Sequence, residues 1–172
     1  MIHLAAIIPE GMYRNRMLEY CTERRSVEMI AFESVESFSQ AMSHADLPDV
    51  ILYDIDAENG QAISSLKSLT AQFESSPTLV YSSHDDATTI FQSLTAGARG
   101  YLLKSEAPSF IYDCIESCYD GDAPMSPEVA RIITGFFNRR KKPERDPLLE
   151  ERMTLLRLLA KDRTKEEADT ND

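Results

Sequence analysis

Three residues with chemically useful side chains stand where short apolar segments of the chain end. Asp54 closes the run Val-Ile-Leu-Tyr-Asp, Ser82 closes Thr-Leu-Val-Tyr-Ser, and Lys104 follows Tyr-Leu-Leu. A carboxylate can attack phosphorus as a nucleophile, while an ammonium group and a hydroxyl can hydrogen-bond the phosphoryl oxygens. If the three residues meet, the combination predicts a site that captures a phosphoryl group. An Asp at the end of a strand can also do no more than cap the following turn.

The segments that carry these residues alternate with segments of helical periodicity. Apolar runs bounded by turn residues predict five strands, at residues 4–8, 27–32, 48–54, 78–82 and 101–103. Helices are expected at residues 12–23, 35–42 and 60–74, between the Asp85-Asp86 pair and Gly97, and from Pro108. This alternation indicates an α/β fold, with a parallel sheet covered by helices on both faces. Such folds bind ligands at the carboxyl ends of their strands, where the three polar residues stand.

Composition limits the classes of protein to consider. The 172 residues suffice for one domain of typical size and an appendage. A formal net charge of -11 argues against binding of nucleic acid or a membrane surface by the whole molecule. No apolar stretch approaches the roughly 20 residues that span a bilayer, and the first residues lack the basic flank of a signal peptide. We therefore expect a cytoplasmic protein without a membrane partner.

The site residues lie in three longer segments that occur in a family-specific order. These are Pro-Asp-Val-Ile-Leu-Tyr-Asp, Tyr-Ser-Ser-His-Asp-Asp and Ala-Gly-Ala-Arg-Gly-Tyr-Leu-Leu-Lys. Together they resemble a bacterial response-regulator receiver domain, and the last two resemble the NarL/FixJ (LuxR-type) group in particular. The resemblance implies a receiver domain over residues 1–121. It also implies a flavodoxin-like, doubly wound five-stranded parallel sheet of order 2-1-3-4-5, followed by a C-terminal helical extension.

The resemblance also implies roles for the residues at the strand ends. A partner sensor histidine kinase would phosphorylate Asp54, Ser82 and Lys104 would bind the phosphoryl group, and rotation of Tyr101 would report the change. Tyr101 is equally well interpreted as a half-buried strand aromatic. The implied protein is a response regulator of a two-component phosphorelay, which switches dimerisation or an attached transcriptional output. It is not an enzyme beyond autophosphorylation and slow autodephosphorylation at Asp54.

One part of the sequence departs from the family pattern. Receivers usually end the first strand in two acidic residues that hold Mg²⁺, and the matching positions here are Ile8 and Pro9. Neither side chain offers the oxygen ligand that Mg²⁺ requires. Glu10 and Asp56 are possible substitute ligands beside Asp54, although Glu10 is also well interpreted as a solvated loop residue. We therefore expect Mg²⁺ binding to be weak or absent.

Two alternatives to a phosphorylated receiver stay open. The first is an atypical pseudo-receiver that acts by protein–protein contacts without phosphorylation. The second is an aspartyl-nucleophile hydrolase, because Asp54-Ile55-Asp56 resembles the Asp-x-Asp motif of haloacid-dehalogenase phosphatases. That family carries the motif on its first strand, whereas here it lies on the third expected strand, so the hydrolase is the weaker alternative.

The residues after the receiver form two further segments. Residues 122–147 are expected to hold a helix that starts at Ser126-Pro127 and a basic linker. The linker has five cations, and it either contacts DNA phosphates or is a solvated, extended segment. The candidate contact residues are Arg139, Arg140, Lys141 and Lys142. Residues 148–172 resemble the opening of a LuxR-type helix-turn-helix and end before a recognition helix. We expect DNA reading only if a complete output domain exists beyond this chain.

The apolar residues of these C-terminal segments also predict self-association. The helix from Ser126 and the leucine-rich segment from Leu148 have apolar stripes without an obvious partner in the chain. Burial of such stripes favours a homodimer, and related receivers commonly pair through the fourth helix, fifth strand and fifth helix. The competing expectation is that the helices fold back on their own receiver and leave a monomer.

Overall fold

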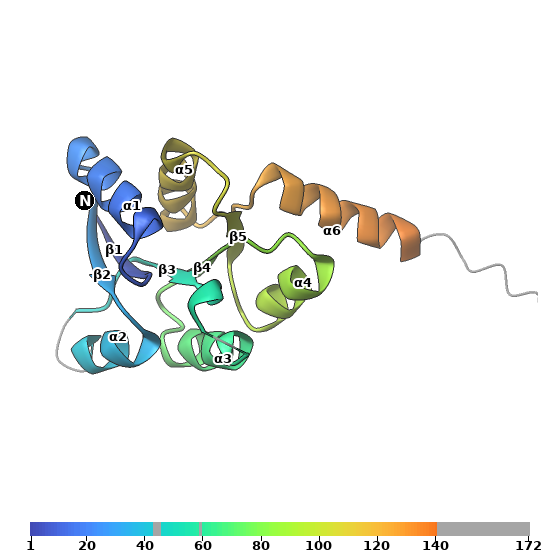
Figure 1. Ribbon diagram of the computed structural model, residues 1–172, viewed down its shortest axis with the longest axis horizontal. Coiled ribbons are helices and arrows are strands. Elements are labelled where there is room, and N and C mark those ends of the chain that lie inside the picture. The colour runs from blue at the N-terminus through green and yellow to red at the C-terminus, as the bar shows by residue number, and fades with distance from the viewer. Residues whose placement is uncertain (43–45, 59, 141–172) are drawn as a thin grey trace, which may run out of the picture. The chain divides into compact units, whose positions relative to one another are not determined.

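The computed structural model describes residues 1–42, 46–58 and 60–140 (Figure 1). The chain divides into two compact units, Met1–Thr134 and Gly135–Asp172. Of the second unit, only the end of a helix belongs to the described residues. The expected helix-turn-helix segment and the linker cations Lys141 and Lys142 lie outside them.

The first unit is built on one sheet of five parallel strands in the order β2-β1-β3-β4-β5, which confirms the expected doubly wound topology. The strands are β1 (Ile2–Ile7), β2 (Val27–Phe32), β3 (Val50–Asp54), β4 (Thr78–Ser82) and β5 (Gly100–Leu103). In register, Asp54 stands opposite Tyr81, and Ser82 stands opposite Leu103. The last residues of β3 and β4 and the residue after β5 therefore share one edge of the sheet.

Helices cover both faces of this sheet (Figure 1). They are α1 (Met12–Arg24), α2 (Val35–Met42), α3 (Ala62–Gln72), α4 (Ala87–Thr95), α5 (Pro108–Tyr119) and α6 (Pro127–Arg140), with a short 3-10 turn η1 (Ile55–Ala57) after β3. Alternate residues of the strands enter two separate clusters of buried apolar side chains. One cluster includes residues of α1 and α5, and the other includes residues of α2, α3 and α4.

The expected elements differ from the observed ones only at their ends. The first strand starts two residues early, because Ile2 already pairs with Val27 on β2. The third helix begins at Ala62 rather than at residue 60, because Gly60 has a left-handed φ of 77°. Asp86 caps α4 by accepting a hydrogen bond from the Thr89 N–H, as the Asp85-Asp86 pair predicts.

The chain after α5 covers the outer edge of β5. Met125 pairs with Tyr101, the Ser126 N–H donates to the Tyr101 carbonyl at 3.0 Å, and the Leu103 N–H donates to Ser126 Oγ at 2.9 Å. These bonds satisfy backbone groups that an edge strand would otherwise leave open to another chain. A dimer that added a strand at this edge of β5 would have to break these bonds.

The first half of α6 packs against the receiver instead of exposing its apolar stripe. Val129 is fully buried, and Ile132 and Ile133 pack partly buried against the cluster that contains Tyr101 and Leu103. The expectation that this stripe has no partner in the chain is thus wrong for these residues. The competing expectation of fold-back describes them, because these apolar side chains lose water-exposed area against their own receiver.

The close approach of residues 124–126 to β5 predicts that a side chain at Gly100 is not tolerated. A Cβ at this position would lie 2.0 Å from the Pro124 carbonyl oxygen. We expect Gly100→Ala to lower the free energy of unfolding by about 1–3 kcal/mol, measured by urea unfolding with circular dichroism. The matched control is Gly135→Ala in α6, where the nearest atom to the added Cβ is 4.0 Å away. Equal stability of Gly100→Ala and the wild type would contradict the packing described here.

Candidate functional site

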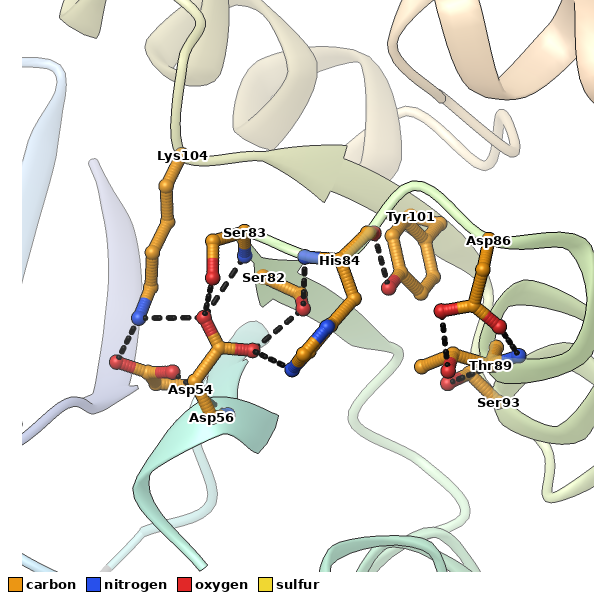
Figure 2. A network of polar contacts seen from close by, with 10 residues as sticks. All are labelled: Asp54, Asp56, Ser82, Ser83, His84, Asp86, Thr89, Ser93, Tyr101 and Lys104. Atoms are coloured by element: carbon orange, nitrogen blue, oxygen red, sulfur yellow. Dashed lines mark hydrogen bonds and ion pairs between the residues drawn. The ribbon is translucent and has the colours of Figure 1, made fainter.

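The three predicted residues meet at the carboxyl edge of the sheet (Figure 2). Asp54 is the last residue of β3, Ser82 is the last residue of β4, and Lys104 follows β5. Lys104 Nζ lies 2.8 Å from Asp54 Oδ2. The other oxygen of Asp54 accepts a hydrogen bond from the Asp56 N–H at 3.0 Å. Asp54 therefore caps the turn η1 and also pairs with Lys104 at the edge of the sheet, so the capping interpretation and the site interpretation both describe its geometry.

Asp56 lies at the centre of the site, although the sequence marked it only as a substitute metal ligand. Its Oδ1 accepts the hydroxyl of Ser82. Its Oδ2 accepts the Ser83 N–H and the Ser83 hydroxyl, both at 2.7 Å, and lies 3.0 Å from Lys104 Nζ. Ser83 is not among the site residues that the sequence predicts. Its position immediately after Ser82, at the end of a strand, was the available signal.

Lys104 is buried between the two carboxylates. Its side chain is 8% exposed, and its Nζ lies 5.0 Å from the centre of the Tyr13 ring and 5.7 Å from that of Tyr81. Burial favours the neutral amine, but the hydrogen bonds and charges of Asp54 and Asp56 outweigh this and raise the pKa of Lys104. The ammonium group therefore stays charged and interacts with both aromatic faces.

The two carboxylates that share this cation have their pKa values shifted in opposite directions. Burial raises the pKa of Asp54 above its ordinary value, against the opposing effect of Lys104. Burial also disfavours the charged form of Asp56, but the hydrogen bonds from Ser82, Ser83 and Lys104 prevail and lower its pKa to about 2. Asp56 is thus the more firmly ionised of the two acids.

The residues around Asp54 do not fit the magnesium site that the family resemblance implies. Ile8, the residue after β1, is 1% exposed and belongs to the apolar core, so it contributes no side-chain oxygen. Glu10 is exposed, as its interpretation as a solvated residue predicts, and its N–H donates to the Glu33 carboxylate. Across the described part of the chain, no three His, Cys, Asp or Glu side chains gather in a way that could hold a metal ion. Weak Mg²⁺ binding stays a prediction.

Tyr101 is connected to the site by a chain of hydrogen bonds. Its side chain is fully buried rather than half-buried, which corrects one of the two interpretations of this residue. Its hydroxyl donates to the His84 carbonyl at 2.8 Å, and the His84 N–H donates to Ser82 Oγ at 3.0 Å (Figure 2). The position of Tyr101 is therefore tied, through two hydrogen bonds, to the hydroxyl that binds Asp56.

The proposed DNA-contacting residues are only partly described. Arg139 is exposed near the end of α6, and its Nε donates to the Gly135 carbonyl at 3.3 Å. Arg140 is the last residue of that helix. Contact of these cations with DNA stays a prediction. No helix among the described residues is long and apolar enough to cross a membrane.

Comparisons with known proteins agree on one family. Residues 11–116 match the sequence model described as Response regulator receiver domain. The chain is 25% identical over 108 residues to Oxygen regulatory protein NreC of Staphylococcus carnosus, which covers 62% of this chain and 49% of that protein. It is 30% identical over 122 residues to the Glycerol metabolism activator of Pseudomonas putida, covering 70% of this chain and 55% of that protein. The chain spans about half the length of these curated relatives.

Solved structures show the same fold. The isolated REC domain of RcsB from Salmonella enterica serovar Typhimurium matches with a TM-score of 0.69 and 16% identity, covering 78% of this chain and 99% of that one. A LuxR family DNA-binding response regulator from Silicibacter pomeroyi matches with a TM-score of 0.61 and 20% identity, covering 74% of this chain and 98% of that one. At such identities the likeness establishes the fold alone.

The lowered pKa of Asp56 predicts a pH-dependent stability. A carboxyl group whose pKa falls from 3.8 to about 2 on folding stabilises the protein above pH 3.8, and this contribution is lost as the pH falls through 2. Asp56→Asn should therefore cost about 2 kcal/mol at neutral pH, and the difference from wild type should shrink below about pH 4. Urea unfolding at several pH values measures it, with the exposed Asp113→Asn as the control. A difference that stays constant with pH would contradict the assigned ionisation.

Proposed function

The chain belongs to the response-regulator receiver family, and on this premise we propose that it is a two-component receiver in which Asp54 accepts a phosphoryl group from a sensor histidine kinase. The observation that carries this proposal is the pair formed by the Asp54 carboxylate and the Lys104 ammonium group, 2.8 Å apart at the ligand-binding edge of the sheet. The family assignment supports a role in two-component signalling. It gives no support to the hydrolase interpretation of Asp54-Ile55-Asp56.

The proposed transfer is a nucleophilic displacement at phosphorus. An oxygen of ionised Asp54 forms a bond to the phosphorus of the kinase's phosphohistidine, the phosphorus–nitrogen bond breaks, and the histidine leaves with its electron pair. The Lys104 ammonium group stands where it can neutralise charge on the transferred phosphoryl oxygens. Only the ionised form of Asp54 can attack, so its raised pKa makes the reaction less favourable as the pH falls.

We place the output of this receiver at the start of α6. The route would run from Ser82 through His84 to Tyr101, and on to Ser126, whose N–H donates to the Tyr101 carbonyl. A change at the strand ends can thus reach Ser126, the residue immediately before α6. Dimerisation and transcriptional output would follow from movement of this helix, and DNA contact would require a complete output domain. A homodimer stays a prediction.

A second candidate function has its own supporting observation. The apolar Ile8 and Pro9 replace the acidic pair, and the described residues offer no substitute set of metal ligands. Phosphoryl transfer to Asp54 then proceeds with less neutralisation of the phosphoryl charge. This favours a pseudo-receiver that acts by protein contacts alone, with the same fold and the same route from Tyr101 to α6.

Incubation with acetyl phosphate separates the two candidates. If Asp54 is the acceptor, intact-mass spectrometry should detect one added phosphoryl group per chain, and Asp54→Asn should abolish it. Because the acidic pair is missing, added Mg²⁺ should accelerate the reaction only weakly. The matched control is Asp85→Asn, an exposed carboxylate that should leave the reaction unchanged. No added mass after prolonged incubation with Mg²⁺ would overturn the phosphoacceptor role and favour the pseudo-receiver.

A further inference from the structure

Four hydrogen-bond donors from two other strand ends converge on the carboxylate of Asp56 (Figure 2). They are the Ser82 hydroxyl, the Ser83 N–H, the Ser83 hydroxyl and the Lys104 ammonium group. Hydroxyls, a backbone N–H and a fixed cation are the groups that proteins use to hold a tetrahedral oxyanion. Asp56 itself is only 16% exposed, so it lies within the donor set rather than over its rim.

The same donors stand next to the proposed phosphoacceptor. Lys104 Nζ lies 2.8 Å from Asp54 Oδ2 and 3.0 Å from Asp56 Oδ2, so the two carboxylates share one cation. An oxyanion near Asp54 that accepted hydrogen bonds from Lys104 and Ser82 would compete with Asp56, which already accepts hydrogen bonds from both. Two anions so close together repel each other, so both cannot keep full use of the donors.

We propose that the Asp56 carboxylate is an internal occupant of an oxyanion site formed by Ser82, Ser83 and Lys104. In this role Asp56 holds the hydroxyl of Ser82 as a phosphoryl oxygen would. The ligand class of the emptied site is a tetrahedral oxyanion such as sulfate or phosphate. The inference deepens the proposed function, because it takes these donors to be the ones that read the phosphoryl group of Asp54.

Hydrogen bonds also connect the Asp56 carboxylate to the side chain of Tyr101. Ser82 Oγ donates to Asp56 and accepts the His84 N–H, and the His84 carbonyl accepts the Tyr101 hydroxyl. A continuous chain of hydrogen bonds therefore connects the Asp56 carboxylate to the buried tyrosine. In the proposed arrangement, the Asp56 carboxylate stabilises the buried position of the Tyr101 side chain. An incoming oxyanion must displace Asp56 before it can bind Ser82, Ser83 and Lys104.

The proposal predicts that removal of Asp56 creates an oxyanion site. The probe is sulfate, which resembles phosphate but cannot transfer a phosphoryl group, and the readout is the NMR shift of the Ser83 and His84 backbone amides. Asp56→Ala should bind sulfate saturably, with an affinity about tenfold or more above wild type. Asp56→Asn, which keeps the shape of the occupant, should bind more weakly than Asp56→Ala. Asp113→Ala, an exposed change, should match the wild type.

Two further variants keep the test decisive. Lys104→Met combined with Asp56→Ala should lose sulfate binding, and Asp56→Ser supplies a second small, uncharged residue if Asp56→Ala does not fold. Sulfate binding that is equal in wild type and in folded Asp56→Ala, or absent from both folded small-residue variants, would overturn the proposal. Because sulfate binding requires no transfer, its outcome is independent of the acetyl phosphate reaction. Failure of the phosphoacceptor role and failure of the internal occupant are therefore distinguishable.

Discussion

A buried ammonium group determines the arrangement of the site at the carboxyl edge of the sheet. Lys104 follows β5 with 8% of its side chain exposed, and a cation in such a position destabilises the fold unless anions are close. Asp54 at the end of β3 and Asp56 in η1 supply them. Because the three residues come from different elements, these two ion pairs join the end of β3 and the turn η1 to the residue after β5.

Asp54 and Asp56 share the Lys104 cation, but their carboxylates have different surroundings and different roles. Asp56 receives hydrogen bonds from both serines as well as from Lys104, and its pKa falls to about 2, so it behaves as a fixed anion. Asp54 has fewer donors and a pKa raised mainly by burial. Neighbouring acids whose environments push their pKa values apart commonly divide structural and chemical roles. We assign the nucleophile to Asp54 and the occupation of the oxyanion donors to Asp56.

The sequence predicted those features that follow from periodicity and from the rules of parallel sheets. Asp54, Ser82 and Lys104 were found because parallel strands bring their carboxyl ends to one edge. The central role of Asp56 was missed, because it depends on how η1 turns after β3, and a three-residue turn has no periodic signal. The apolar face of α6 was recognised, but the choice between its own receiver and a second chain as its partner stayed open. Periodicity predicts that Val129 is buried, and it does not say against which element.

A double-mutant cycle between Asp56 and Lys104 tests the central claim, that a shared and buried cation holds the site together. The free energies of unfolding of wild type, Asp56→Asn, Lys104→Met and the double variant are compared at neutral pH. We predict that the double variant loses about 1.5–3 kcal/mol less than the sum of the two single losses. The exposed pair Arg131–Glu128 is the control and should show much smaller coupling. Losses at Asp56 and Lys104 that add to within about 0.5 kcal/mol would contradict the account.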